Sequence, residues 1–329
     1  MYDVPEYDAM FADRARTEAY LSAIRRAVSA GSTVVEVGTG VGYFAVAACR
    51  AGAGRVYAIE SNPAVELATQ LAIDNGCADR ITFIREDSRR VTLPERGDVL
   101  LSDLRGVLPL FRTHIETVAD ARTRLMRPGG ALVPRQDSLW VAPCTAPADW
   151  RRDHDDFGAD AHGIDRRAVA ARVRSEWSRC RLDAGELLGG GVRWATLDYA
   201  TIESPNVAGG AEWTFSRDGT ADGLAIWFEG DLGFGVTLSN APGAPRTLYG
   251  QAFFPFERRV PVLAGDRLTV ALTATCVNDV YVWGWNSTLT AGAPRSRPVS
   301  FRQSTLASHV VSLERLRELS ADDCAESGG

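Results

Sequence analysis

The chain has 329 residues, 45% hydrophobic and 24% charged, which is typical of a folded protein long enough for two domains. A net charge of −6 and an isoelectric point near 5.4 exclude a general nucleic-acid binder, which needs clustered cations. The first residues lack a signal-peptide pattern, and no long apolar run or CxxC pair occurs, so we expect a cytoplasmic protein with no membrane partner and no metal site.

The first half of the chain has the pattern of an α/β fold. A helical segment over residues 1–30 is expected to precede it. Residues 31–145 then alternate short apolar runs (TVVEV, RVYAIE, RITFIRE, DVLLSDL and GALVP) with amphipathic stretches. Because alternating strands and helices form parallel sheets covered on both faces, this pattern predicts a Rossmann-type sheet, of the seven-stranded kind found in methyltransferases.

A glycine-rich turn, EVGTGVG, follows the first predicted strand from Glu36 to Gly42. Glycines there allow a tight turn and a close approach to a ligand, but this spacing alone fits NAD, FAD, S-adenosylmethionine or a purely structural turn. Glu60 ends the next strand about 20 residues later, where a carboxylate can bind both ribose hydroxyls. The alternative for Glu60 is a solvated acid at a strand end.

The third strand ends at REDS, which places Asp87 and Ser88 beside the same crevice, where they suit an adenine ring. The turn MRPGG then leads into the fifth strand, as is common in adenosylmethionine methyltransferases. Taken together, these features favour S-adenosylmethionine over a nicotinamide cofactor.

The second half, residues 146–318, changes to short β patterns separated by GG, RDG, PGAP and AGD turns. This series predicts a C-terminal antiparallel β-barrel domain. In RLTVALTATCV, alternate residues from Leu268 to Cys276 share one face and are expected to be buried. Residues 319–329 are small and acidic, and we expect a flexible tail.

The whole arrangement resembles the protein arginine methyltransferase family. The segment MFADRARTEAYLSAI is similar to the family's helix before the glycine motif, with Asp13, Arg16 and Tyr20 at matching places. The resemblance implies that Arg16 binds the carboxylate of the methyl donor, that Tyr7 closes over the donor, and that a helical arm around residues 160–180 holds a homodimer together.

The motifs and the resemblance define an expected site. Its cofactor-binding residues are Arg16, Glu36, Gly38, Gly40, Gly42, Glu60, Ser61, Asp87, Ser88 and Ser102. Its acceptor-binding residues are Tyr7, Met10, Asp13, Leu248, Tyr249 and Trp283. Its catalytic residues are Asp103, Arg112 and His114.

The loop SDLRGVLPLFR departs from the family, which carries two glutamates there for the substrate guanidinium. The match puts Asp103 at the first glutamate and Arg112 at the second, and the family's Thr-His-Trp loop reads Thr247-Leu248-Tyr249. Two like charges about 4 Å apart cost on the order of 4 kcal/mol at an effective dielectric of 20. An arginine acceptor in the family's pose is therefore disfavoured.

These departures predict a methyltransferase for a non-arginine small-molecule or peptide acceptor with an acidic group, methylated on nitrogen or oxygen in natural-product metabolism. Asp103 would accept a hydrogen bond and Arg112 would bind the anionic group. Two alternatives remain: an arginine or guanidino N-methyltransferase that uses Asp103 alone, and a catalytically silent partner subunit that binds the donor.

Simpler roles stay open for several of these residues. Arg112 could pair with Glu116 four residues later on a helix surface, and Asp103 could serve packing alone. A lone helical histidine such as His114 is more often a surface or capping residue, and an aromatic at an alternate strand position, such as Trp283, is usually part of the core.

Overall fold

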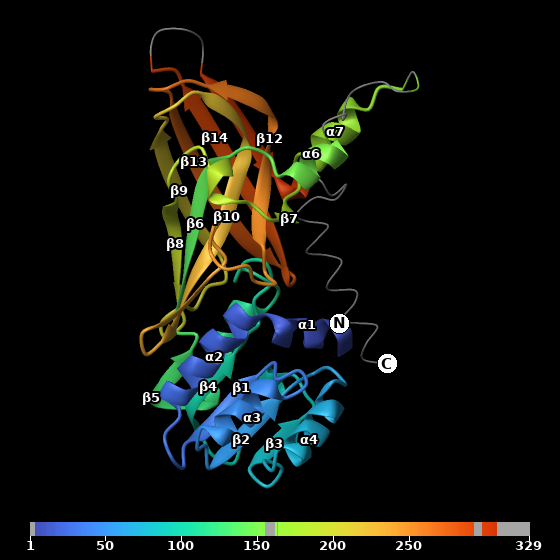
Figure 1. Cartoon of the computed structure of the whole chain (residues 1–329), viewed down its shortest axis with the longest axis vertical. Helices are drawn as coiled ribbons and strands as arrows, with labels where there is room; N and C mark the ends of the chain where they lie inside the picture. The colour runs from blue at the N-terminus through green and yellow to red at the C-terminus, as the bar shows by residue number, and fades with distance from the viewer. Residues whose placement is uncertain (1–3, 155–161, 163, 293–297, 308–329) are drawn as a thin grey trace.

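The computed structural model describes residues 4–154, 162, 164–292 and 298–307. A parallel sheet with its helices lies at one end of the molecule, and a tall antiparallel barrel lies at the other (Figure 1). Helices α1 (Val4–Ala12) and α2 (Arg14–Ala27) lie where these two parts meet. The expected tail over residues 319–329 lies outside the described residues.

The parallel sheet has the strand order β3-β2-β1-β4-β5. Its strands are β1 (Thr33–Val37), β2 (Arg55–Ile59), β3 (Ile81–Ile84), β4 (Gly97–Ser102) and β5 (Met126–Val133). Its covering elements are α3 (Tyr43–Arg50), α4 (Val65–Asp74), η1 (Ser88–Arg90) and α5 (His114–Arg124). Every residue of β1 is buried, because a central parallel strand is covered on both faces.

The described sheet has five strands, so the expectation of seven was wrong. The cause lies in the next strand, β6 (Gln136–Cys144), which follows a cis peptide bond between Val133 and Pro134. Instead of extending the parallel sheet, β6 pairs antiparallel with two barrel strands. The barrel therefore begins before the expected boundary at residue 145.

Two antiparallel sheets form the barrel. One has the order β7-β12-β10-β6-β8 with β11 beside β10, and the other has the order β15-β14-β13-β9. The strands after β6 are β7 (Ser178–Cys180), β8 (Val192–Asp198), β9 (Val207–Thr214), β10 (Gly219–Gly233), β11 (Val236–Ser239), β12 (Gln251–Val262), β13 (Arg267–Val277), β14 (Val280–Thr290) and β15 (Val299–Ser304). In β13, burial alternates as predicted through Ala274, while Cys276 is only partly buried.

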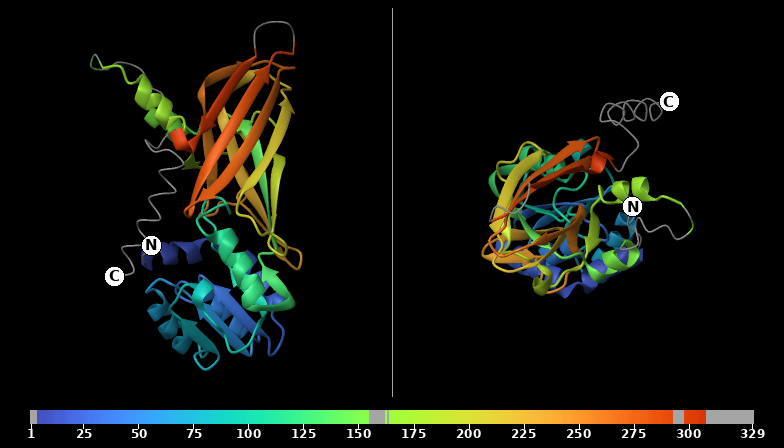
Figure 2. Two further views of the ribbon diagram at one scale, coloured as in Figure 1. Left: turned by 180° about the vertical axis from the view of Figure 1, so that it is seen from behind. Right: turned by 90° about the horizontal axis from the view of Figure 1, so that it is seen from above.

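A helical arm leaves the barrel between β6 and β7. It contains α6 (Ala148–His154) and α7 (Arg167–Val173), and it projects away from the barrel wall (Figure 2). Part of the expected arm, residues 160, 161 and 163, lies outside the described residues. The 3-10 turn η2 (Ala184–Glu186) follows β7 in the chain, and the 3-10 turn η3 (Thr305–Ala307) follows β15.

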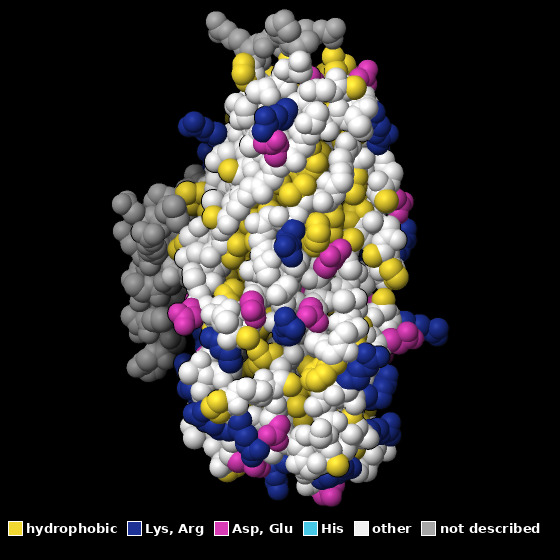
Figure 3. Space-filling view, turned by 90° about the vertical axis from the view of Figure 1, so that its left-hand side faces the viewer, with side chains coloured by type: hydrophobic (Ala, Val, Ile, Leu, Met, Phe, Trp, Pro, Cys, Tyr) yellow, Lys and Arg dark blue, Asp and Glu magenta, His cyan; other side chains and the backbone are white. Residues whose placement is uncertain are grey.

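The surface carries charged side chains of both signs. On the face in Figure 3, acidic and basic side chains are interspersed, with basic side chains more frequent over its lower part. Among the described helices, none combines the length and the apolar character that crossing a bilayer requires.

Candidate active site

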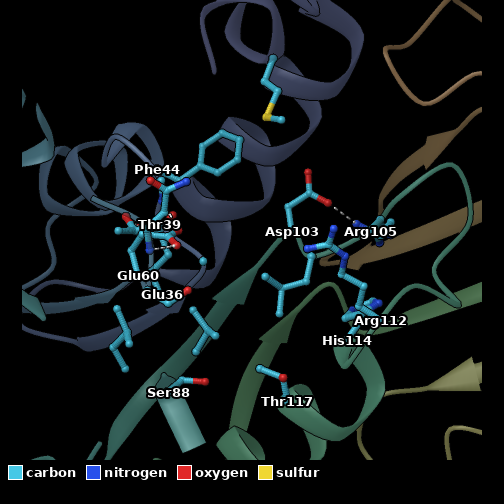
Figure 4. A pocket seen from close by; sticks show the side chains of 18 of the residues that line it. Glu36, Thr39, Phe44, Glu60, Ser88, Asp103, Arg105, Arg112, His114 and Thr117 are labelled. Carbon is cyan, nitrogen blue, oxygen red and sulfur yellow. Dashed lines mark hydrogen bonds and ion pairs between the residues drawn. The ribbon is translucent and has the colours of Figure 1, made fainter. Parts of the chain in front are cut away.

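A cavity of about 580 Å³ opens at the carboxyl ends of β1, β2 and β4, where α1, α2 and the barrel meet the parallel sheet. This is the position at which open α/β sheets bind ligands. Its volume lies in the usual range for small-molecule sites. Figure 4 shows the acids Glu36 and Glu60 on one side of this cavity and Asp103, Arg105 and Arg112 on the other.

The glycine-rich turn between β1 and α3 forms the floor of the cavity. Gly38 and Gly40 have φ values of 78° and 55°, which favour glycine. A Cβ on Gly40 would lie 2.5 Å from Cε1 of Tyr7, so α1 packs directly on the turn. Tyr7 is 8% exposed, and Phe11 stacks on Tyr43 with ring centroids 4.5 Å apart. Tyr7 therefore lies against the turn at the edge of the cavity, and its closure over a bound donor stays a prediction.

Two carboxylates face the turn. Glu60 accepts hydrogen bonds from the backbone N–H groups of Gly40 at 2.9 Å and Asn62 at 2.8 Å. Glu36 is 3% exposed and accepts a hydrogen bond from Oγ1 of Thr39 at 2.6 Å. Burial raises the pKa of Glu36 from 4.5 to about 7, although the Thr39 hydrogen bond partly offsets it. Both carboxylates are positioned to accept hydrogen bonds from ligand hydroxyl or ammonium groups.

The raised pKa of Glu36 predicts a pH effect on the ligand-free protein. Between pH 4.5 and about 7, the folded protein holds a proton that the unfolded chain has released, so this group's contribution to stability falls as pH rises. Glu36→Gln removes this titration. We therefore expect the melting temperature of Glu36→Gln minus that of the wild type to rise as the pH is raised from about 5 to about 7.5.

Differential scanning fluorimetry at stepped pH measures this difference. Glu66→Gln, an exposed acid in the first turn of α4, is the matched control and should show no such trend. A difference between Glu36→Gln and wild type that stays constant over the range would show that Glu36 does not titrate there.

Arg16 and Asp103 form the centre of the site. Asp13 caps α2 by accepting a hydrogen bond from the N–H of Arg16, and this cap orients the first turn of the helix. The Nε of Arg16 lies 2.6 Å from Oδ2 of Asp103, and the side chains are 7% and 6% exposed. The hydroxyl of Tyr249 donates to the same oxygen at 2.6 Å. Burial alone would raise the pKa of Asp103, but the charges of Arg16 and Arg105 outweigh it and lower the pKa.

A second buried ion pair lies behind Asp103. Arg105 binds both carboxylate oxygens of Asp137, with Nε at 2.9 Å and Nη2 at 2.8 Å, and neither side chain is exposed. Its Nη1 also contacts Oδ1 of Asp103 at 3.2 Å. The hydroxyl of Tyr199 donates to Asp137, and Arg105 donates to the hydroxyl of Tyr20. Because Asp137 belongs to β6 and Arg105 to the loop after β4, this network joins the barrel to the parallel sheet.

Arg112 lies at the other end of the same loop. Its side chain is exposed, lines the cavity and lies over the ring of Phe111 at 5.2 Å. Within the described part of the chain, its guanidinium forms no ion pair with Glu116, so the expected alternative of a helical surface pair is not observed. Arg112 instead precedes α5 with a φ of 45°.

His114 is buried, contrary to the surface alternative, and it lines the cavity. Its Nδ1 lies 2.7 Å from the carbonyl oxygen of Pro109. Because a carbonyl only accepts, Nδ1 carries the hydrogen, and Nε2 is left without one. Burial lowers the pKa of His114, so the neutral form prevails at pH 7.

Most of the expected site residues line this cavity. They are Tyr7, Met10, Arg16, Glu36, Gly38, Gly40, Glu60, Ser61, Asp87, Ser88, Asp103, Arg112, His114, Leu248 and Tyr249. Asp87 is partly engaged, because its carboxylate binds Arg89 at 2.7 Å. Asp13 lies outside the lining, where it holds the N–H groups of Arg16 and Leu248.

Three other expected residues do not line the cavity and instead serve packing or backbone structure. Trp283 is 1% exposed and packs in the barrel core against Trp194 and Phe254, so its assignment to the acceptor site was wrong. Gly42 is the N-cap residue before α3, where a Cβ would lie 2.8 Å from Cβ of Ala68. Ser102 is buried at the end of β4, and its carbonyl accepts the hydroxyl of Tyr20.

Sequence reasoning missed Arg105 and its partner Asp137. The position of Arg105, two residues after Asp103, was a usable signal, because a cation so close to a strand-end acid changes what that acid can bind. Asp137 gave no such signal, since it lies 32 residues away in a strand of the other part of the fold. Arg89, Thr39 and Thr117 also line the cavity without having been expected there.

Comparisons with known proteins agree with this architecture. Residues 2–120 match the family model described as the TRM5/TYW2 methyltransferase domain. An arginine N(omega)-methyltransferase from Streptomyces achromogenes subsp. streptozoticus is 31% identical over 279 residues, which cover 82% of this chain and 76% of the relative. Protein arginine N-methyltransferase 6 from Xenopus tropicalis is 27% identical over 293 residues, covering 84% and 86%.

Among solved structures, the Trypanosoma brucei PRMT1 enzyme-prozyme heterotetrameric complex with AdoHcy matches with a TM-score of 0.82. The match covers 90% of this chain and 97% of that chain at 20% sequence identity. At that identity, the likeness establishes a shared fold, including the order of the parallel sheet and the barrel.

Proposed function

This chain belongs to the protein arginine methyltransferase family of S-adenosylmethionine-dependent methyltransferases, and on that premise we propose that it methylates a guanidino nitrogen of arginine. The observation that carries the proposal is Asp103, a buried carboxylate with a lowered pKa that lines the cavity beside Arg16. An ionised carboxylate there can accept N–H hydrogen bonds from a guanidinium. The relatives thus favour the arginine alternative over the expected non-arginine acceptor.

The cavity fits S-adenosylmethionine, which supplies a methyl group on a sulfonium. Gly38 and Gly40 line the cavity without side chains of their own, and the carboxylates of Glu36 and Glu60 suit hydroxyl and ammonium donors. Arg16 uses Nε for Asp103 and Nη1 for the carbonyl of Met10. Its Nη2 has no hydrogen-bond partner in the described structure, and we expect this group to hold the carboxylate of the methyl donor.

Asp103 has a positioning role in this proposal. Its oxygens already accept from Arg16, Arg105 and Tyr249, which leaves room for about one further donor. Because its pKa is lowered, it is a poor proton acceptor, so it orients the guanidino group and does not deprotonate it. His114, neutral with Nε2 free of hydrogen, is the cavity-lining group that we expect to accept the released proton.

The proposal is tested by incubating the purified protein with S-adenosylmethionine and separate acceptors: free arginine, an arginine-containing peptide and lysine. Mass spectrometry should find a gain of about 14 Da, one methyl group replacing a hydrogen, on arginine and none on lysine. Binding of S-adenosylmethionine without methylation of any acceptor would instead favour the silent partner subunit. Action on a small molecule in natural-product metabolism, in the cytoplasm, stays a proposal.

We also propose that the chain forms a homodimer through its arm. On the arm, Ile164 and Val169 are 66% and 55% exposed, and on α4, Leu67 and Ile73 are 47% and 55% exposed. Two separate apolar faces on one chain allow the arm of each copy to pack on the α4 surface of the other. The Trypanosoma brucei structure of the same fold is a heterotetrameric complex, so association of such chains has a precedent.

Val169→Asp is expected to convert the dimer to a monomer, because the interface would bury an unpaired charge. Size-exclusion chromatography with light scattering measures the mass. Leu263→Asp is the matched control, since Leu263 is 39% exposed but lies in the turn between β12 and β13 of the barrel. If the wild type is a monomer, or if Val169→Asp leaves the dimer intact, the arm is not the interface.

A further inference from the structure

Arg112 differs from the other arginines of the cavity. Within the described lining, four arginines face the space: Arg16, Arg89, Arg105 and Arg112. Arg16 and Arg105 pair with Asp103, and Arg89 pairs with Asp87. Arg112 has no carboxylate within ion-pair distance among the described residues. It is therefore the cation in the described lining whose charge is left for a ligand.

The local backbone fixes where this charge lies. Arg112 has a φ of 45°, a left-handed conformation that is uncommon for a residue with a side chain. Its guanidinium stacks over Phe111, and the N–H of His114 donates to the carbonyl of Phe111 at 3.0 Å. Uncommon backbone conformations of this kind are concentrated at ligand-binding sites. In Figure 4 the Arg112 side chain extends into the cavity on the side of Asp103.

The cavity thus offers two opposite charges to an acceptor. Asp103 is an ionised acid that contacts Arg16, and Arg112 is a cation without a carboxylate partner in the same loop. The barrel side adds Leu248 and Tyr249, neither of which carries a charge at neutral pH. An acceptor that pairs with both Asp103 and Arg112 must carry a cationic group and, a short chain away, an anionic group.

We propose that Arg112 binds a carboxylate of the acceptor and thereby selects a small guanidino acid, with free arginine as its simplest form, over an arginine residue within a protein chain. This inference rests on the proposed methylation of a guanidino group. An internal arginine residue has its own carboxyl group tied up in a peptide bond, so it leaves Arg112 unpaired. Free arginine presents the guanidinium to Asp103 and the carboxylate to Arg112.

The test compares free arginine with agmatine, which is arginine without its carboxylate. For the wild-type enzyme we expect kcat/KM to favour arginine by about 10- to 100-fold, the usual value of one hydrogen bond to a charged group. Arg112→Ala should lower kcat/KM for arginine by a similar factor and leave agmatine unchanged. Arg112→Lys should keep part of the preference, because it retains the charge. Arg25→Ala, an exposed arginine on α2, is the control.

Calorimetry in the presence of S-adenosylhomocysteine gives a second readout, since the same loss should appear in the dissociation constant of arginine but not of agmatine. Equal losses on both acceptors would overturn the role of Arg112, and so would a wild-type enzyme that prefers arginine peptides. In both cases the guanidino methylation itself would stand. A wild-type enzyme that methylates no guanidino compound would overturn the proposed function, and this inference with it.

Discussion

Asp103→Asn is expected to lower kcat/KM for arginine by about 100- to 1,000-fold, the range seen when one preorganised electrostatic group is removed from an active site. The variant keeps the size of the side chain and an oxygen that can accept from Tyr249. It removes the negative charge that orients a guanidinium. Figure 4 shows Glu36 and Glu60 on the opposite side of the cavity from Asp103, so neither is placed to replace it.

Steady-state kinetics with arginine and donor binding by calorimetry separate two explanations. If the loss is in acceptor orientation, S-adenosylmethionine still binds Asp103→Asn, and the turnover falls. Asp74→Asn, an exposed acid at the end of α4, is the matched control and should retain wild-type activity. A nearly active Asp103→Asn enzyme would mean that the acceptor is held elsewhere.

Asp137→Ala is expected to have the largest effect on stability, lowering the free energy of unfolding by about 3–5 kcal/mol. The guanidinium of Arg105 is not exposed to solvent, and the substitution removes the carboxylate that accepts two of its hydrogen bonds. The hydroxyl of Tyr199 loses its acceptor as well. Urea unfolding followed by tryptophan fluorescence measures the loss, because Trp194 and Trp283 are buried in the barrel core and become exposed on unfolding.

A compensated variant distinguishes a buried charge from general packing damage. Replacing the pair by apolar groups, in Arg105→Met with Asp137→Leu and Tyr199→Phe, should recover most of the lost stability, since a removed pair leaves no uncompensated charge. If the triple variant is as unstable as Asp137→Ala, the loss comes from packing and not from the ion pair.

The sequence was sufficient to predict that several residues expected on the donor side lie together, and they line one cavity. Glu36, Gly40 and Glu60 are close to one another along β1, its turn and β2, and strand ends of a parallel sheet meet at one edge. Local spacing therefore determines their positions in space. The resemblance added Arg16, whose contact with Asp103 joins residues 87 positions apart.

The acceptor side could not be predicted as well, because it depends on long-range contacts. Asp137 reaches the site through barrel pairing, which no local pattern reveals. Trp283 lies in a strand whose alternating pattern does not show which face is buried. Only the closed barrel shows that this side chain points into the core. The prediction of seven strands in the parallel sheet was wrong for a related reason. The sequence of β6 is compatible with either sheet, and only its pairing partners show which one it joins.

The expected repulsion of an arginine acceptor by Arg112 also depended on an assumed position. The estimate placed two cations about 4 Å apart at an effective dielectric of 20. Arg112 is exposed in the structure, and at the dielectric of water the same pair costs only about 1 kcal/mol. A carboxylate on the acceptor would reverse the sign of this interaction, so Arg112 is compatible with free arginine.

Locating the new methyl group is the most direct test of guanidino methylation. Tandem mass spectrometry of the product formed from free arginine and S-adenosylmethionine distinguishes methyl groups on the guanidino nitrogens, the α-amine and the carboxylate. We expect fragments that carry the methyl group on a guanidino nitrogen. A methyl ester or an α-N-methyl product would contradict the proposal, because either would place the other end of the molecule beside the sulfonium.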